Sequence, residues 1–166
     1  MSATAASIRH AAADDIPACA ELAWAAGHER DQAGWRDALR DDLIAPGRHL
    51  SVAEAGGTIV GYGRAMLFLP AADAPADSAP RGYYLTGTFV RPDHRRMGVG
   101  TALTEARLAW IRRRDDEAWY FANARNLASI ELHRRLGFCE VTRDFSFPGV
   151  TFDGGVGVLC RAALRN

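Results

Sequence analysis

The stretch that decides the fold runs from Tyr83 to Thr101 and reads YYLTGTFVRPDHRRMGVGT. Its first part, Tyr83 to Val90, is rich in aromatic and β-branched side chains, a composition that favours a β-strand. A helical spacing of apolar residues begins at about Gly98 and continues to Arg112, which predicts an amphipathic helix. The segment therefore predicts a strand, a short turn and a helix.

The turn between that strand and that helix is a candidate anion site. Gly98 and Gly100 let the backbone turn tightly and approach a ligand closely. The first amides of a helix have no carbonyl partner within it, and the helix dipole attracts anions to the same end, where Arg95 and Arg96 add charge. The stretch is not a dinucleotide fingerprint, because Leu103 stands where G-x-G-x-x-G needs a glycine. It predicts a phosphate or pyrophosphate site, with an ordinary turn flanked by solvated arginines as the alternative.

Periodicity and turn residues predict the elements on either side of this segment. Before it we expect a strand at 7–11, a helix capped by Asp14, a helix capped by Asp31 and ended by Pro46 and Gly47, a hairpin of strands 49–55 and 58–69 around Gly56–Gly57, and a loop at 70–82. After it we expect a strand at 118–122, a helix at 126–136 ended by Gly137, and a closing pair of strands at 138–147 and 156–163. This order predicts a mixed sheet with helices on both faces.

Composition narrows the class of protein. A length of 166 residues fits one domain, and the net charge of +0 supplies no long-range field for nucleic acid or for an anionic membrane. All twenty basic residues are arginines, which excludes a Schiff-base lysine and a Walker lysine. The three cysteines form no C-x-x-C pair and the five histidines show no metal spacing, so we expect packed thiols, no metal and a reduced, cytoplasmic setting.

Two motifs together resemble the GNAT N-acetyltransferase superfamily. They are V-x-P-x-x-R-x-x-G-x-G from Val90 to Gly100 and N-x-x-S-x-x-L-H-x-x-L-G-F from Asn126 to Phe138. The resemblance implies an α/β (α+β) fold: a single domain over residues 1–166 with a mixed, largely antiparallel, twisted sheet of about seven strands and about four helices on both faces. It also implies an acetyltransferase that uses acetyl-CoA.

The resemblance also implies roles for individual residues. Backbone amides near Phe89 and Val90 would pair with the pantetheine arm of acetyl-CoA, and one of them would stabilise the oxyanion. Asn126 and Ser129 of the second motif would lie near the same cofactor. The pyrophosphate would be held by the loop at the start of the helix, which comprises Arg95, Arg96, Met97, Gly98, Val99, Gly100 and Thr101.

His133 departs from the family pattern, because tyrosine is most often found at this position. A protonated histidine, with a reference pKa of ~6.5, can protonate the departing thiolate, so His133 is a candidate general acid; a structural role in the cofactor groove is the alternative. The general base is left open, because YYLTGTFV contains no carboxylate. The candidates are Glu29, His28, Asp153, or a water chain held by Thr86, Thr88 or Tyr84.

We expect the acceptor to be a small-molecule amine or a peptide amine. Glu29, Trp35, Tyr84 and Asp153 are the candidate acceptor residues, since acids with aromatics suit a cationic amine. The predicted reaction is direct attack of the amine on acetyl-CoA in a ternary complex; the alternative is a non-catalytic CoA- or acyl-CoA-binding regulatory module, and a nucleotide-binding regulator is a weaker one. We expect no nucleic-acid or membrane partner, and a homodimer is possible.

Overall fold

The computed structural model describes residues 5–27 and 30–165. Seven strands follow the order β1-β2-β3-β4-β5-β7-β6 in one sheet, in which only the pair β4 and β5 is parallel among the pairings described. With the four α-helices found among the described residues, this is the mixed, largely antiparallel architecture that the resemblance implied. The chain divides into two compact units, one of residues 5–66 and Thr86–Trp110 and the other of Leu67–Leu85 and 111–165.

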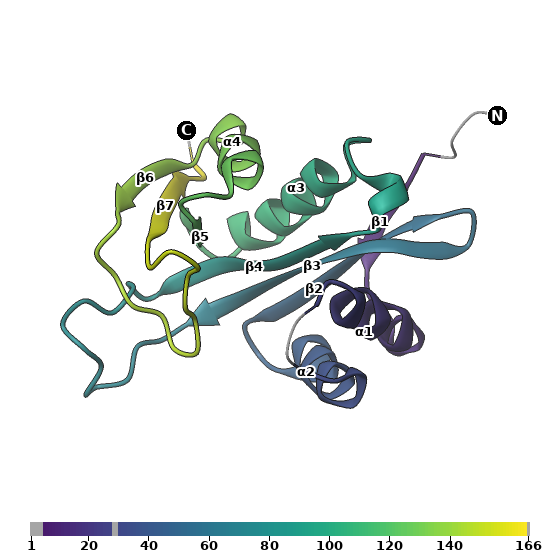
Figure 1. Ribbon diagram of the computed structural model, residues 1–166, viewed down its shortest axis with the longest axis horizontal. Coiled ribbons are helices and arrows are strands. Elements are labelled where there is room, and N and C mark those ends of the chain that lie inside the picture. Colours follow the sequence, from purple (N-terminus) through teal and green to yellow (C-terminus); the bar gives the residue numbers. More distant parts are fainter. Residues whose placement is uncertain (1–4, 28–29, 166) are drawn as a thin grey trace. The chain divides into compact units, whose positions relative to one another are not determined.

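The first unit is built on an antiparallel run of three strands. β1 (Ser7–His10) pairs with β2 (Arg48–Ala55), and β2 pairs with β3 (Thr58–Phe68) (Figure 1). Gly56 and Gly57 join β2 to β3 with φ angles of 58° and 78°, a conformation that glycine adopts without strain. The predicted hairpin is therefore confirmed.

Two helices lie between β1 and β2 in the chain, α1 (Ile16–Ala25) and α2 (Gln32–Ile44). The Asp31 side chain accepts a hydrogen bond from the Gly34 amide at 2.8 Å, so the predicted cap of α2 is confirmed. The cap predicted at Asp14 is wrong. A 3-10 turn, Ala13–Asp15, precedes α1, and it is Asp15 that accepts from the Ala12 amide, at 2.7 Å.

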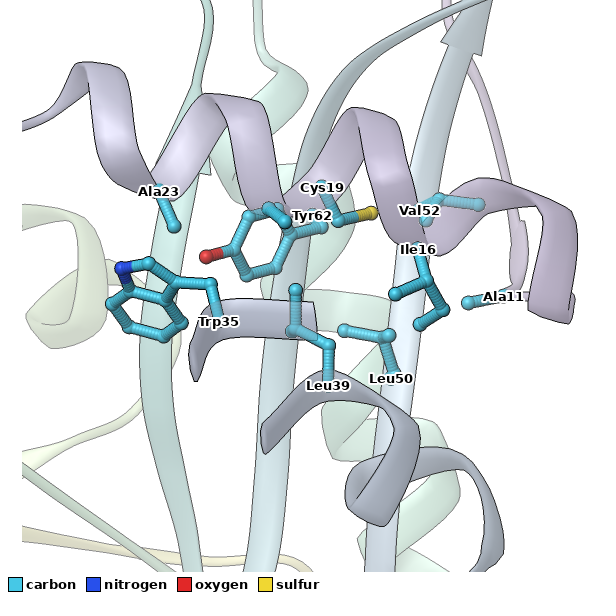
Figure 2. Packing of buried hydrophobic residues seen from close by; sticks show 10 residues of the cluster. Ala11, Ile16, Cys19, Ala23, Trp35, Leu39, Leu50, Val52 and Tyr62 are labelled. Carbon is cyan, nitrogen blue, oxygen red and sulfur yellow. The ribbon is translucent and has the colours of Figure 1, made fainter. Parts of the chain in front are cut away.

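The two faces of β2 and β3 are both covered by helices, α1 and α2 on one side and α3 (Val99–Arg112) on the other (Figure 1). Toward α1 and α2 the strands present Leu50, Val52 and Tyr62, which are no more than 1% exposed (Figure 2). Ala53 and Val60 instead pack with Val99 and Leu103 of α3. Two buried faces explain why these strands are apolar on both sides.

The second unit contains the start of β4 (Gly82–Val90), β5 (Glu117–Asn123), β6 (Cys139–Thr142) and β7 (Gly157–Ala163), with α4 (Leu127–Arg135) between β5 and β6. The parallel register aligns Tyr84 with Trp119 and Leu85 with Tyr120. β7 lies between β5 and β6 and is antiparallel to both.

One predicted strand of this unit is too long. Residues 138–147 were expected to form a strand, but β6 covers only Cys139–Thr142. β6 ends the strand order and is mostly exposed, so its sequence has less burial to sustain a longer ladder. Cys19 and Cys160 are buried free thiols as expected, whereas the expectation of packing is wrong for Cys139, which is exposed on this edge strand.

No helix within the described residues is long and apolar enough to cross a membrane.

Candidate active site

The turn that leads from β4 into α3 has an unusual backbone. A short 3-10 helix, Pro92–His94, is followed by Arg96 with φ 59° and Gly98 with φ 81°. Among the described residues, Arg96 alone of the non-glycines has a positive φ, a conformation that costs a side-chain-bearing residue free energy. Alternating backbone conformations of this kind aim successive amides at one concave side, where an anion can accept from them.

Most of the residues predicted to hold the pyrophosphate lie on the surface of this turn. Arg95, Arg96, Met97 and Gly98 are exposed, and a Cβ placed on Gly98 would meet nothing within 4 Å. The Arg95 Nε atom donates to the Val90 carbonyl at 3.1 Å, which ties this arginine to the end of β4. An accessible turn next to a cation fits an anionic ligand.

The first residues of α3 divide between the core and the surface. Val99 is only 6% exposed and belongs to the apolar cluster against β2 and β3. Gly100 and Thr101 are half-buried, and the Gly100 carbonyl accepts from the Thr104 hydroxyl at 2.8 Å. Val99 therefore anchors the helix, while the amides of its first turn lack carbonyl partners within the helix.

The last residues of β4 carry the other predicted cofactor contacts. Phe89 and Val90 are half-buried. The Phe89 ring stacks on Tyr62 with centroids 5.0 Å apart and meets the edge of Trp35 at 6.1 Å. Gly87, which is exposed and has φ 44°, breaks the regular extended backbone two residues before Phe89.

Trp35, a predicted acceptor residue, is nearly buried, with 7% of its surface exposed. Two arginines flank it: the guanidinium carbons of Arg30 and Arg64 lie 4.9 and 5.7 Å from its ring centroid. Arg64 pairs with the buried Asp42 carboxylate, which also accepts from Arg48 at 3.0 Å. Glu29 and His28 lie outside the described residues.

A buried arginine in α3 was not singled out from the sequence. Arg107 is 0% exposed, and burial lowers its pKa to about 9, so it stays protonated at neutral pH. The helical pattern places position 107 on the inner face, but an arginine at such a position more often reaches solvent. Gly63 makes room for this side chain, since a Cβ there would lie 2.7 Å from the Arg107 Nε atom, but no sequence pattern links the two positions.

In the second unit, His133 of α4 is buried at 6% exposure and stacks on Tyr120 of β5. The ring centroids are 3.5 Å apart and the planes differ by 6°. The His133 Nδ1 atom lies 2.8 Å from the Ser129 carbonyl, an acceptor only, so Nδ1 carries a proton. Nε2 is therefore the ring nitrogen that gains or loses a proton.

Tyr120 is a second residue that the sequence did not reveal, because its position in a buried strand is typical of core aromatics. Its hydroxyl makes a short hydrogen bond with the Ser129 hydroxyl. Burial is the main cause that raises the Tyr120 pKa to about 12. Tyr120, Ser129 and His133 thus form one connected group, joined through the hydroxyl and the carbonyl of Ser129.

The remaining predicted residues of the second unit have clear local roles. The Asn126 side chain caps α4 by accepting from the Ser129 amide at 3.3 Å. Tyr84 is 0% exposed and its hydroxyl donates to the Pro80 carbonyl at 2.8 Å. Asp153 is exposed, and its carbonyl accepts from the Asn123 side chain at 2.8 Å.

Metal ligands were also considered. Within residues 5–27 and 30–165, no group of three or more His, Cys, Asp or Glu side chains is arranged to hold a metal ion.

Comparison with known proteins identifies the class. Residues 16–138 match the acetyltransferase (GNAT) family, and the chain belongs to this family. The predicted class of protein, a GNAT acetyltransferase, is confirmed. A mycothiol acetyltransferase from Thermobispora bispora is 34% identical over 99 residues, which cover 58% of this chain and 32% of that protein. The matched part thus spans about a third of the relative's length.

Solved structures show the same fold. The yncA protein of Salmonella typhimurium, solved with its cofactor acetyl-CoA, superposes with a TM-score of 0.75 at 21% identity, covering 98% of this chain and 95% of that one. A ribosomal-protein-alanine N-acetyltransferase from Brucella melitensis gives a TM-score of 0.74 at 24% identity, covering 95% and 99%. The expected GNAT fold is therefore confirmed.

Proposed function

We propose that this protein transfers the acetyl group of acetyl-CoA to a primary amine by direct attack in a ternary complex. The observation that carries the proposal is the turn into α3, where Arg96 and Gly98 adopt positive φ angles beside exposed arginines. Such a turn fits the pyrophosphate of CoA, because oriented amides and a helix N-terminus bind phosphate without a lysine. Family membership supports acetyl transfer as the reaction class.

The residues that would hold the cofactor follow the sequence motifs. In this proposal the amides of residues 95–101 bind the pyrophosphate, those near Phe89 and Val90 meet the pantetheine and the developing oxyanion, and Asn126 and Ser129 contribute from α4. When bound, acetyl-CoA supplies the activated acetyl thioester. The protein supplies preorganised donors for the negative charge that develops on the carbonyl oxygen.

The amine must lose a proton before it can attack. An alkylamine with a pKa of ~10.4 is protonated at pH 7, and freeing its lone pair costs about 4.6 kcal/mol. The Thr88 hydroxyl oxygen accepts from the Arg107 guanidinium at 2.7 Å, which leaves its O–H to orient a water. Tyr84 is fully buried with its hydroxyl on Pro80. The proton therefore leaves through water, or through Glu29, His28 or Asp153.

His133 is the proposed general acid for the departing thiolate. Its Nδ1 proton is held by the Ser129 carbonyl, so protonation and release take place at Nε2. The substitution His133→Phe keeps an aromatic ring against Tyr120 and removes both nitrogens. We expect turnover to fall about 10- to 100-fold, since general acid catalysis contributes on this order or more.

The readout for His133→Phe is steady-state kinetics at pH 6 to 9, together with calorimetric titration of acetyl-CoA. Cofactor affinity should stay within about threefold of the wild type, because the ring packing against Tyr120 is kept and the one contact known to be lost is the Nδ1 hydrogen bond to the Ser129 carbonyl. Equal turnover of the two proteins across this pH range would remove the acid role.

A second candidate function, a non-catalytic CoA- or acyl-CoA-binding module, is favoured by one observation: β4 carries no carboxylate, and its Thr88 hydroxyl is engaged by Arg107. The deciding experiment is a mass-spectrometric screen of amine pools, small molecules and peptides, with acetyl-CoA. An acetylated amine establishes the transferase. Acetyl-CoA binding with no acetylated amine would favour the binding module instead.

Three further expectations belong to this proposal. We propose that residues 1–166 act as a single N-acetyltransferase domain, that the free thiols Cys19, Cys139 and Cys160 reflect a reduced cytoplasmic setting, and that the protein can form a homodimer. Sedimentation velocity over a range of concentrations tests the dimer.

A further inference from the structure

The side chain of Arg107 makes an unusual set of contacts for a buried cation. It donates from all three nitrogens, and its acceptors are the Leu103 carbonyl at 3.1 Å, the Arg64 carbonyl at 2.9 Å, the Thr86 carbonyl at 3.4 Å, the Thr88 hydroxyl at 2.7 Å and the Thr104 hydroxyl at 3.0 Å. These acceptors come from α3, β3 and β4. One planar guanidinium therefore joins three elements of the first unit.

No carboxylate pairs with Arg107 among the described residues; every acceptor above is neutral. Taking a charge out of water is costly unless dipoles or a counter-charge compensate. Here carbonyl and hydroxyl dipoles perform that task. The positive charge is consequently retained inside the protein instead of being cancelled by an acid.

The backbone of β4 is irregular where Arg107 reaches it. Gly87, with φ 44°, lies between Thr86 and Thr88, the two β4 residues that Arg107 contacts. A residue in this conformation interrupts the alternation of a strand, so neighbouring carbonyls lose their regular ladder geometry. Arg107 supplies the donors that hold this irregular segment.

The opposite strand is adapted to the same side chain. Gly63 of β3 faces α3, and a Cβ at this position would lie 2.7 Å from the Arg107 Nε and 2.9 Å from its guanidinium carbon. Any residue other than glycine would have to displace the guanidinium. Gly63, Gly87 and Arg107 therefore form one arrangement that sets the shape of β4 at residues 86–88.

From this geometry we infer that Arg107 is a positioning residue for acetyl transfer: it fixes Thr86–Thr88 of β4, and through them the amides of Phe89 and Val90, while keeping a positive charge beneath that segment. The inference rests on the proposed function for its chemical consequence. Fixed donors near a buried positive charge favour an oxyanion, because they need no reorganisation when the negative charge develops. The contacts by which Arg107 holds residues 86–88 of β4 do not depend on the reaction.

Two substitutions of Arg107 separate geometry from charge. Arg107→Met removes both the guanidinium fork and the charge, and Arg107→Lys keeps the charge without the fork. We expect kcat to fall about 100-fold for Arg107→Met, the order associated with a displacement of about 1 Å in a catalytic group, and about 10-fold for Arg107→Lys. The KM for acetyl-CoA should change less than kcat in both variants, because the proposed pyrophosphate contacts at residues 95–101 stay in place while only the amides near Phe89 and Val90 shift.

The matched control is Leu108→Ala. Leu108 is the next residue of α3 and is 5% exposed, so its truncation destabilises the same helix without touching β4 through hydrogen bonds. We expect kcat of Leu108→Ala within about threefold of the wild type at a temperature where all variants are folded. A loss in Leu108→Ala as large as that in Arg107→Met would mean that general destabilisation explains the effect, and would overturn the inference.

Amide hydrogen exchange provides a readout that does not depend on activity. In Arg107→Met, exchange of residues 86–90 should accelerate at least tenfold relative to the β2–β3 hairpin, with Arg107→Lys intermediate and Leu108→Ala unchanged. Unchanged exchange at residues 86–90 in Arg107→Met overturns the inference even if the wild type is an active enzyme. A wild type without acetyl transfer overturns the proposed function, and the exchange result still decides the role of Arg107.

Discussion

The two faces of the β2–β3 sheet are both buried, yet they are buried in different ways. Toward α1 and α2 the contacts are mostly apolar and centre on Cys19, Trp35, Leu39 and Tyr62 (Figure 2). One buried ion pair, between Asp42 of α2 and Arg64 of β3, lies beside them. Toward α3 the same strands meet polar groups as well: His49 stacks on Trp110 with centroids 5.0 Å apart, and Gly63 makes room for Arg107. The apolar face supplies stability, whereas the polar face lies against the helix whose first turn is the candidate cofactor site.

This difference separates an interface dominated by apolar packing, toward α1 and α2, from one that also buries the positive charge of Arg107, toward α3. A dry, close-packed interface contributes free energy in proportion to the apolar area it buries. Arg107 is a buried cation that only the surrounding dipoles stabilise, so it is not expected to add much to the stability of the fold. Its presence is better explained by the shape that it gives β4 at residues 86–88. The predictions below test whether stability and ligand binding separate between the two faces.

The largest effect is expected for Leu39→Ala on the apolar face. Leu39 is 0% exposed in the cluster between α2 and the sheet, so its truncation leaves a cavity. The free energy of unfolding should fall by about 3 to 4 kcal/mol. Urea denaturation measures this loss, and calorimetry should show acetyl-CoA affinity within about twofold of the wild type. A large loss of affinity in the folded variant would show that the two faces are not separable.

The next effect is expected for Gly98→Glu at the start of α3. Glutamate at this position places negative charge beside the proposed pyrophosphate site, on a backbone with φ 81°. Acetyl-CoA should bind at least 100-fold more weakly, which is about 2.7 kcal/mol. Isothermal titration calorimetry provides the measurement.

The control for Gly98→Glu is Gly57→Glu in the β2–β3 hairpin. Gly57 has φ 78° and, like Gly98, open space around a Cβ, so strain and added charge are closely matched. Gly57→Glu should leave acetyl-CoA affinity unchanged. Equal losses of affinity in the two variants would argue against a site at the α3 turn.

The smallest effect is expected at a paired charge, for comparison with the unpaired Arg107. Asp15 accepts from Arg9 at 2.7 and 2.9 Å, and the Arg9 hydrogen bonds hold its pKa below the usual value of 3.8. Asp15→Asn should lower the free energy of unfolding at pH 7 by about 1 to 2 kcal/mol, discounted because Arg9 is 41% exposed.

The pH dependence of this effect has a definite sign. The folded-state pKa of Asp15 is lowered, so the ionised carboxylate stabilises the folded protein. This contribution to the free energy of unfolding is complete above pH 3.8 and is lost as the pH falls below that value. The difference between wild type and Asp15→Asn should therefore shrink in acid. Asp14→Asn, a change at an exposed neighbour, is the control and should stay within about 0.5 kcal/mol of the wild type. A constant difference down to pH 2.5 would contradict the assigned ion pair.

Much of the fold was predictable because its signals are local. The glycine pair 56–57 and the Asp31 cap act over a few residues, and the structure confirms both. The cap of α1 was wrong, since a 3-10 turn shifts the start of the helix and its N-cap residue, Asp15, makes no side-chain cap hydrogen bond. The length of β6 was also wrong, because the extent of an edge strand depends on what pairs with it.

The candidate site was only partly predictable. The motifs identify the α3 turn and α4, and the family match confirms the class that they imply. Periodicity does not reveal that His133 stacks on Tyr120, that Arg30 and Arg64 flank Trp35, or that Arg107 bridges three elements. Except for Arg30 and Trp35, the partners come from separate helices and strands, and no local pattern specifies them.

The sequence by itself thus determined the order of the elements, the glycine turns and the family, because backbone preference and apolar spacing operate within a few residues. Only the tertiary structure decided which polar groups are buried and what satisfies them. The cost of burying Arg107 depends on acceptors that distant segments bring into hydrogen-bonding range, such as the Arg64 carbonyl 43 positions away. The chemistry of the site therefore becomes visible only when the strands and α3 are assembled.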